Sequence, residues 1–398
     1  STCATMTVNG AVHANGGVYY GSGSDLVFNG DVEATSGISS PKNNGAGPWT
    51  KSNDNTDFNA KEITNAPSVT VSLNMTNSHF LIDIPPAGED PSTSSLGQQR
   101  LYNEAQMVLV VTNGTGSGAG TNPTVTLTMQ SGINGAVNGS DLSKIVWTLT
   151  NATTVRLATN FPFLSLTNSF YDQRELKTNI ITDINVGTFA TWSATNSRVQ
   201  GKLPASSGVY QTILYVADRR TGTTTQPGQL SVVRLNNGAQ LPANNGMGFS
   251  VATQNPLYVD GNYNTQIAGS AANASASTTN TTYTVPAALL SDSLTVLSGS
   301  WTDSESKTKS QTYSDGSTAF DAANTTINAA IITGTIPSTG NTDTTFSGGV
   351  HNLTRLLEDW SGKNLYLNTS ILRLFDSQMA NHQFMKPGTY YEPPTRKF

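Results

Sequence analysis

The sequence predicts a mainly β protein, with a parallel β-solenoid-like body, an inserted antiparallel β-sheet domain and a short C-terminal helix. Three observations lead to this prediction. Charged residues make up only 12% of the 398 residues, and Ser, Thr, Asn and Gly fill the polar positions. Short apolar runs recur between Asn-Gly and Gly-Gly corners near the N-terminus, and similar runs return in the C-terminal half. Between them, alternating β-branched runs are typical of antiparallel strands.

The first segment, residues 1–66, reads as N-terminal solenoid coils followed by a loop. In "VNGAVHANGGVYYGSGSDLVFNGDVEATSGI" (8–38) the corners follow one another too closely for an ordinary hairpin sandwich. A parallel solenoid stacks the inward residues of each coil on the next coil, and its corners need residues that tolerate positive φ. Antiparallel hairpins remain the alternative, because Asn-Gly is also a favoured two-residue hairpin turn. Residues 39–62, rich in Asn and Gly without periodicity, are expected to form a long loop.

The middle segment, residues 67–207, is expected to form the inserted antiparallel domain. Its predicted strands are "SVTVSLNMT", "HFLIDI", "QMVLVVTN", "TVTLTMQ" and "KIVWTLT". They alternate or run continuously in β-branched residues and are separated by Gly, Asn and Pro. A charged stretch then follows at residues 171–177, where we expect a turn that opens onto an apolar helix or strand.

The third segment, residues 208–398, is expected to return to solenoid coils and to end in a helix and a hairpin. As in residues 8–38, short apolar runs are bounded here by Gly, Asn, Asp and Pro corners. The runs are "GVYQTILYVAD", "GQLSVVRLNNG", "GMGFSVATQNPLYVDGNYNT" and "TVPAALLSDSLTVLSGSW". Leu353, Leu356, Leu357 and Trp360 lie at i, i+3, i+4 and i+7, which predicts a helix over about 350–360 that ends near Gly362. Residues 317–334 are a second, weaker helix candidate, and "KNLYLNTSILRLFDSQMA" predicts two strands.

Composition and charge exclude several classes of protein. The net charge is −5 and the 21 Lys and Arg residues are scattered, so we expect no nucleic-acid partner. The single cysteine, Cys3, excludes an intrachain disulfide. No apolar run approaches the roughly 20 residues that a membrane-spanning helix needs, so we expect no membrane span and a soluble chain. Few charges with many hydroxyl and amide side chains suit an exported or cell-surface β protein.

Several stretches resemble a poorly characterised bacterial family of large exported β-rich proteins. They are "MTVNGAVHANGGVYYGSGSDLVFNGDVEATSGI", "SFYDQRELKT", "NPLYVDGNYNT" and "FSGGVHNLTRLLEDWSGKNLYLNTSILRLF". Members of this family, often from Verrucomicrobia-type bacteria, are usually labelled pilus-assembly or prepilin-like proteins. The resemblance implies an extracellular or cell-surface location in a bacterium. It supplies no catalytic residues, and the hydrophobic pilin-type helix that precedes the β-rich part in such proteins does not occur in this sequence.

Two groups of acidic residues are candidate catalytic sites. Asp31 and Glu33 lie two apart, so on a strand they would face the same side and could serve as acid and base of a glycosidase. They suit equally a solvated outer face that discourages edge aggregation. Asp172 and Glu175, with Arg174 between them, could form a carboxylate pair with an arginine clamp, or simply a charged turn.

Other chemistry finds little support in the sequence. The four histidines do not pair at metal-ligand spacing, and we expect them at corners or on the surface: His13, His79, His351 and His382. No serine-hydrolase elbow and no phosphate-binding loop occurs, so we expect no metal and no cofactor. The candidate aromatic platforms for a carbohydrate are Tyr19, Tyr20, Trp49 and Trp301. Because Tyr19 and Tyr20 are adjacent, they point to opposite faces of a strand, and at least one is expected in the core.

The function that the sequence favours is structural. We expect an exported or cell-surface protein that acts in pilus-associated assembly or in adhesion. Its expected partners are other copies of itself or other envelope proteins, with glycans as a further candidate. A carbohydrate-active β-solenoid enzyme, either a polysaccharide hydrolase or a lyase, is one alternative function. A non-catalytic glycan-binding module is the other.

Overall fold

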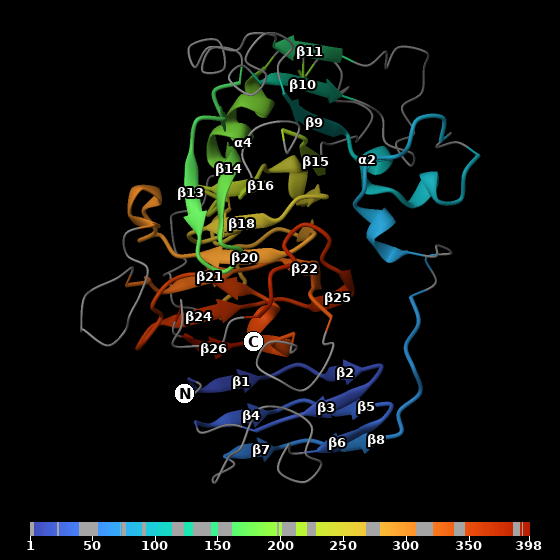
Figure 1. Ribbon diagram of the computed structural model, residues 1–398, viewed down its shortest axis with the longest axis vertical. Helices are drawn as coiled ribbons and strands as arrows, with labels where there is room; N and C mark the ends of the chain where they lie inside the picture. The colour runs from blue at the N-terminus through green and yellow to red at the C-terminus, as the bar shows by residue number, and fades with distance from the viewer. Residues whose placement is uncertain are drawn as a thin grey trace.

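The computed structural model describes residues 4–21, 24–39, 55–71, 73, 77–89, 93–113, 123–129, 145–149, 161–196, 199–200, 212–220, 228–267, 279–307, 321–337, 347–384, 391 and 393–398. The prediction of a mainly β protein is confirmed, because strands far outnumber helices among these residues (Figure 1). Short strands lie above one another along the long axis of the molecule. Within the described residues, no helix is long and apolar enough to span a bilayer.

Sheet A joins the two ends of the chain. All its neighbouring strands are parallel. In spatial order they are β21 (Thr325–Ile327), β24 (Asn364–Leu367), β26 (Thr395–Lys397), β1 (Met6–Val8), β4 (Leu26–Phe28) and β7 (Thr56–Phe58). The N-terminal strands therefore continue the sheet below the last strand of the chain, as Figure 1 shows at the lower end of the molecule.

Two further sheets, D and E, form the other sides of the molecule. We call the described residues from 77 onward the body. Sheet D runs β11 (Ile145–Leu149), β10 (Thr124–Met129), β9 (Met107–Thr112), β15 (Ile213–Asp218), β17 (Phe249–Thr253), β19 (Ala287–Ser291), β22 (Ala330–Thr335) and β25 (Ile371–Asp376). Sheet E runs β12 (Leu164–Ser165), β14 (Lys177–Asn185), β16 (Gln229–Asn236), β18 (Leu257–Asp260), β20 (Leu294–Leu297) and β23 (Arg355–Leu356), with β13 (Ser169–Asp172) also paired to β14.

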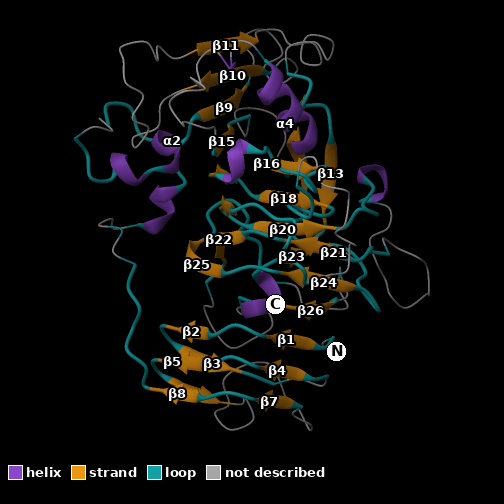
Figure 2. Ribbon diagram, turned by 180° about the vertical axis from the view of Figure 1, so that it is seen from behind, coloured by secondary structure: helices purple, strands orange, loops and turns teal. Residues whose placement is uncertain are grey.

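The N-terminal coils, which we define as residues 5–66, carry two small parallel sheets beside sheet A. Sheet B contains β2 (Val12–Ala14), β5 (Val32–Ala34) and β8 (Glu62–Thr64). Sheet C contains β3 (Gly17–Tyr19) and β6 (Gly37–Ser39). Figure 2 shows these strands stacked at the lower end of the molecule, on the side away from β1, β4 and β7.

Asparagine side chains link successive corners of the N-terminal coils. Asn29 Nδ2 donates to Asn9 Oδ1 at 2.7 Å, and Asn59 Nδ2 donates to Asn29 Oδ1 at 2.8 Å. Each Asn directly follows a strand of sheet A, so the amides lie in register from coil to coil. The Asn-Gly corners that suggested stacked coils in the sequence thus hold stacked amides.

The body has the same arrangement at the corresponding ends of its strands. Asn368 Nδ2 donates to Asn328 Oδ1 at 2.6 Å, and Asn328 Nδ2 donates to the Asn264 carbonyl at 2.9 Å. Asn264 has a φ of 58°, a left-handed conformation that Asn tolerates better than most residues. The Asn264 amide also donates to the carbonyls of Asn328 and Val285, both at 2.7 Å.

The antiparallel strands of the middle segment are joined to the parallel sheets of the body. β9 pairs antiparallel with β10 and parallel with β15. β14 pairs antiparallel with β12 and β13, and parallel with β16. Helices in the described part of this segment include η1 (Ser78–Leu81), η2 (Gly97–Gln99), α2 (Leu101–Glu104) and α4 (Val186–Thr195). η1, η2 and α2 lie on the flank of sheet D (Figure 2).

The main hydrophobic core lies between sheets A, D and E. Its buried side chains run in sequence from Met107 to Tyr391 and include Trp360, which has no exposed surface. A second cluster lies on the outer face of sheet D beneath η1 and α2, and a third lies on the outer face of sheet E. Burial on both faces explains why β20 is apolar along most of its length and why six consecutive residues of β16 are buried.

The predicted helix over 350–360 is wrong. Residues 349–352 form one 3-10 turn, η5 (Gly349–Asn352), and the chain then enters β23. Thr295 and Val296 of β20 pair with Arg355 and Leu356, so the backbone hydrogen bonds of a neighbouring strand replace those of a helix. The apolar spacing reflects burial on both faces of sheet E, because Leu356, Leu357 and Trp360 are all buried.

Four other local predictions are also corrected. Residues 317–334 contain β21 and β22 in place of a helix. Residues 79–84 begin with η1 in place of a strand, and the described residues of 68–76 belong to no strand. The loop expected over 39–62 contains β7 and the start of β8. In each case pairing, or the lack of it, with a distant strand overrides the local pattern.

Candidate functional site

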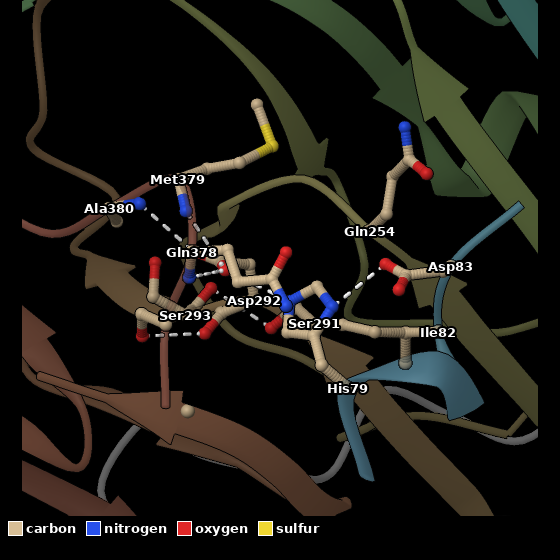
Figure 3. Close-up of polar contacts among 12 residues, drawn as sticks. His79, Ile82, Asp83, Gln254, Ser291, Asp292, Ser293, Gln378, Met379 and Ala380 are labelled. Carbon is tan, nitrogen blue, oxygen red and sulfur yellow. Dashed lines mark hydrogen bonds and ion pairs between the residues drawn. The ribbon is translucent and has the colours of Figure 1, made fainter. Parts of the chain in front are cut away.

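A buried histidine between two aspartates joins sheet D to the segments that cover it (Figure 3). We call His79, Asp83 and Asp292 the His79 site. His79 Nδ1 lies 2.8 Å from Asp83 Oδ1, and His79 Nε2 lies 3.1 Å from Asp292 Oδ1. The side chains of His79 and Asp292 are 2% and 0% exposed, whereas Asp83 reaches the surface.

The local structure explains how His79 is positioned. Asn77 caps η1, since its side-chain oxygen accepts a hydrogen bond from the His79 N–H. Asp83 lies one turn further along, at i+4. Ser78 Oγ donates to the Leu374 carbonyl of β25 at 2.7 Å, so the turn is attached to the edge of sheet D. The imidazole ring packs edge-on against Phe375.

Asp292 lies in the short connection between β19 and β20 and binds the C-terminal part of the chain. Its Oδ1 accepts the N–H groups of Gln378 at 2.5 Å and Met379 at 3.1 Å, and its Oδ2 accepts the Ala380 N–H at 2.9 Å. Three consecutive amides and the histidine therefore surround one carboxylate. This arrangement ties residues 77–84, the β19–β20 connection and residues 378–380 together.

The electrostatics of the site favour a charged imidazole. Burial by itself lowers the pKa of His79, but the hydrogen bonds and charges of Asp292 and Asp83 outweigh it and raise the pKa to about 9. His79 is therefore an imidazolium at neutral pH, with both N–H groups donated to carboxylates. An imidazolium has no lone pair for a metal or for a substrate proton. The site can hold segments together, but it lacks what a general base or a metal ligand requires.

A second buried cluster contains Asp172 and Glu175, the residues that the sequence singled out. Glu175 Oε1 pairs with Arg355 Nη1 at 2.5 Å, and Tyr258 donates its hydroxyl to Asp172 Oδ2 at 2.5 Å. Arg174 lies beside them, and all five side chains are buried. We call Asp172, Arg174, Glu175, Tyr258 and Arg355 the Arg355 cluster. The expected turn is present, because Asp172 Oδ1 accepts the N–H groups of Arg174 and Glu175.

The charges of the Arg355 cluster are set by burial and by each other. Burial and the charge of Glu175 raise the pKa of Asp172. Burial opposes ionisation of Glu175, but Arg355 outweighs it and lowers the Glu175 pKa. Burial and the charge of Arg355 lower the pKa of Arg174 to about 10, and its Nε and Nη1 have no hydrogen-bond partner. Asp172 and Glu175 therefore lie in one buried cluster, but the arginine that pairs with Glu175 is Arg355, whereas Arg174 Nη2 donates to Asn352 Oδ1.

The Arg355 cluster holds the same C-terminal residues as Asp292. Arg355 Nη2 donates to the Ala380 carbonyl at 2.7 Å, and the His382 N–H donates to Glu175 Oε2 at 3.1 Å. Residues 378–382 thus lie between two buried charged groups. Both groups serve the attachment of this segment.

A third group of acidic residues lies on the outer face of sheet E. Arg234 pairs with Asp183 through Nη2 and with Asp303 through Nη1, both at 2.6 Å. Burial raises the pKa of the neighbouring Asp260 to about 6, with the charges of Asp183 and Asp303 adding to the shift against Arg234. Trp301 Nε1 donates to Asp303 Oδ1 at 2.8 Å, so a partly buried aromatic ring lies next to these carboxylates.

The other candidate carboxylates lie on the N-terminal coils. Glu33, in β5, faces outward and pairs with His13 of β2 at 3.1 Å. Asp31 precedes the same strand, and its Oδ1 accepts the Lys61 N–H at 3.0 Å. The hydrogen bond to Glu33 raises the pKa of His13. His13 thus lies within a strand and pairs with the next coil, where the sequence predicted a corner.

The candidate aromatic platforms are separated in space. Tyr19 is 58% exposed, whereas Tyr20 packs edge-on against Phe58 with ring centroids 5.0 Å apart. Trp301 packs against Phe170 on the outer face of sheet E. Trp49 lies outside the described residues. The described residues therefore include one largely exposed candidate ring, Tyr19, which lies on β3, whereas Trp301 lies on the outer face of sheet E.

A shallow groove of about 320 Å³ runs along the corner occupied by the body's stacked asparagines. It is lined by residues such as Asn264, Thr284, Ala287 and Ser370. The lining contains neither an aromatic nor a charged side chain. Stacking on a sugar ring, a common basis of carbohydrate affinity, has no support there.

Sequence reasoning missed His79, Asp292 and Arg355. One signal was present: His79 and Asp83 are four residues apart, the spacing at which side chains meet on one turn of helix. Asp292 interrupts two apolar strands as a lone acid in "LLSDSLTV". Its role depends on residues 86 or more positions later, which no local pattern reveals. Within the described part of the chain, no group of three or more His, Cys, Asp or Glu side chains is placed to hold a metal ion.

Comparisons with known proteins gave no match: no protein-family model, curated protein or solved structure is significantly similar to this chain. The resemblance to exported pilus-assembly proteins therefore stays a prediction.

Proposed function

We propose that this protein is a structural, exported or cell-surface protein of a bacterium, and that its activity is assembly, either pilus-associated or adhesive. The observation that carries the proposal is the open edge of sheet B. β8 pairs with β5 on one side, and no described strand pairs with it on the other. Strand edges with unpaired backbone groups are sites where another chain can add a strand.

The direction of the backbone groups in β8 follows from its register. The Lys61 carbonyl accepts the Val32 N–H, so Lys61 and Ile63 point their backbone groups toward β5. Glu62 and Thr64 consequently point theirs toward the open edge, and both residues are exposed. The charge of Glu62 disfavours indiscriminate pairing, so we expect a specific partner strand.

The sites described above also support a structural activity. The His79 site and the Arg355 cluster attach segments to the body and lie out of reach of a large substrate. Asp31 and Glu33 are engaged with a backbone N–H and with His13 on the surface of the coils. None of these arrangements has an acid and a base on either side of an open cleft, which glycoside hydrolysis needs.

Association of the purified chain tests the proposal. We expect sedimentation velocity to show oligomers that grow with protein concentration. Glu62→Pro and Thr64→Pro each remove one outward N–H from β8, and we expect them to weaken association by about tenfold, roughly one backbone hydrogen bond. Glu62→Ala and Thr64→Ala keep that N–H and are the matched controls. Folded proline variants that associate as well as the wild type would contradict the role of the edge.

A polysaccharide-cleaving enzyme is the second candidate, favoured by Asp260 alone. A carboxyl group with a pKa near 6 beside two carboxylates and Trp301 has the character of a general acid. A screen of polysaccharides tests this candidate. Activity that survives repurification and disappears in Asp260→Asn would favour the enzyme over the structural protein. A monomer that binds one defined glycan with micromolar affinity would favour a binding module.

A further inference from the structure

The N-terminal coils are joined to the body by one pair of strands. In β1 and β26, Met6 is paired with Arg396, and the Arg396 N–H donates to the Thr5 carbonyl at 3.1 Å. The Phe398 N–H donates to the Thr7 carbonyl at 3.0 Å. These contacts are backbone bonds of a parallel ladder, so any chain that presents β26 in the same register can make them.

The apolar cores of the two parts are separate. The buried apolar side chains of the coils are Met6, Phe28, Val32, Ala34 and Ala66. Among the described residues, none of the three hydrophobic clusters of the body includes a residue from the coils. The hydrophobic clusters of the body therefore do not extend into the coils, and the pairing of β1 with β26 is the backbone contact that joins the two parts.

The chain between the coils and the body forms a long connection, which we call the strap (residues 67–77). Ser68–Val71 are exposed, with Val69 and Val71 at 56% and 49%. Asn15 of the coils binds the strap through the Val69 backbone, at 2.6 Å and 2.8 Å. Figures 1 and 2 show the described residues that follow β8 rising along the flank of the molecule. A chain of eleven residues can span at most about 36 Å, enough to reach a neighbouring molecule.

At its upper end the strap continues into η1, which is bound to the body. At its lower end, Val69 of the strap is bound to Asn15 of the coils. His79, directly beyond the strap, is locked to the body through Asp292. Asn15 and Val69 move with the coils. The coils, the strap and the locked η1 therefore have the layout of an element that can leave its own body and dock on another one.

We propose that two copies of this chain exchange their N-terminal coils, so that β1 of one copy pairs with β26 of the other. The proposal rests on the proposed function and adds a second contact between copies to the open edge of β8. The partner is a second copy because only this chain carries β26 in the register that β1 already uses, together with the Phe398 carbonyl that accepts Asn9 Nδ2 at 2.7 Å. Exchange re-forms the same bonds and is a low-cost route to dimers and longer chains. It becomes favourable as concentration approaches the effective concentration of a tethered partner, on the order of millimolar.

A reversible lock tests the exchange. In a Cys3→Ser background, Thr5→Cys and Thr395→Cys place two thiols side by side, one step before Met6 and Arg396 in the register. Neighbouring strands lie about 4.8 Å apart, within the range that a disulfide spans. The oxidised monomer cannot release its coils, whereas the same protein after reduction can.

We expect the oxidised protein, which keeps the open edge of β8 but cannot exchange its coils, to have an apparent association constant at least tenfold lower than that of the reduced protein. We also expect Thr5→Cys and Thr395→Cys single variants, when mixed, to form disulfide-linked dimers that contain one of each. Equal association of the oxidised and reduced forms would overturn the exchange and leave the proposed function standing. Failure of the reduced protein to associate at all would contradict the proposed function itself.

Discussion

Replacing His79 by glutamine should destabilise the protein in a pH-dependent way. Glutamine keeps a hydrogen-bonding group but removes the cation from between Asp83 and Asp292, which are then left as neighbouring buried and half-buried anions. Breaking one member of a buried charged group typically costs about 3 to 5 kcal/mol. We expect a loss of this size at pH 6, where the imidazole is charged in the folded protein.

The pH dependence follows from the two pKa values of the histidine. The folded pKa is about 9 and the unfolded one is 6.5. The stabilisation is therefore fully present below pH 6.5 and is lost as the pH rises through 9, because the folded protein holds the proton longer than the unfolded chain. At about 1.36 kcal/mol per pH unit, the advantage of the wild type over His79→Gln should shrink by about 3 kcal/mol across this window.

Urea unfolding at pH 6, 7, 8, 9 and 10 measures this difference, because other titrating groups cancel between the two proteins. His382→Gln is the matched control, since that partly exposed ring lies against the Gln383 carbonyl at 3.3 Å. An NMR titration of the His79 ring gives the pKa directly. A difference in stability that stays constant from pH 6 to 10, or a His79 pKa below 7, would refute the proposed charge of the site.

Three further predictions concern stability. Leu356→Ala should cost about 2 to 5 kcal/mol in chemical unfolding because Leu356 is fully buried, and exposed Leu372→Ala should change little; equal effects would contradict the packing of β23. Asn328→Ala should cost about 2 kcal/mol because two side-chain hydrogen bonds of the body's asparagine stack are lost, so an unchanged melting temperature would argue against that stack. Burial raises the pKa of Glu358 from 4.5 to about 7, against the hydrogen bonds from Ser298. The wild type should therefore lose stability relative to Glu358→Gln as the pH rises from 4.5 to 7, because the folded protein binds the proton more tightly than the unfolded chain. Parallel pH profiles of the two proteins would disprove the shift.

Much of the strand content could be predicted from local patterns. The runs around Val108, Leu127, Leu235 and Val296 lie in strands as expected, because continuous or alternating β-branched residues report a half-buried or fully buried strand directly. The Asn-Gly corners that suggested stacking also contribute to it, because Asn29 donates a side-chain hydrogen bond to Asn9 of the preceding coil. The strand patterns depend on neighbouring residues only, and the corners are marked by the local Asn-Gly pairs.

Other features could not be predicted because they depend on distant partners. The spacing of Leu353, Leu356 and Leu357 is typical of an amphipathic helix. In the structure, however, β20 is a neighbouring strand that pairs with Arg355 and Leu356. The run "SVTVSLNMT" has ideal strand composition, yet its described residues belong to no strand, and residues 68–71 are exposed. The His79 site was hidden for the same reason, since Asp292 is 213 residues away from the histidine.

The most direct test of the proposed assembly is light scattering of the purified chain over a wide concentration range, at low and at high salt. We expect the mean mass to rise with concentration and to fall little at high salt, because backbone pairing at strand edges dominates and only 12% of the residues are charged. A strict monomer up to millimolar concentration would contradict an assembly function for this protein.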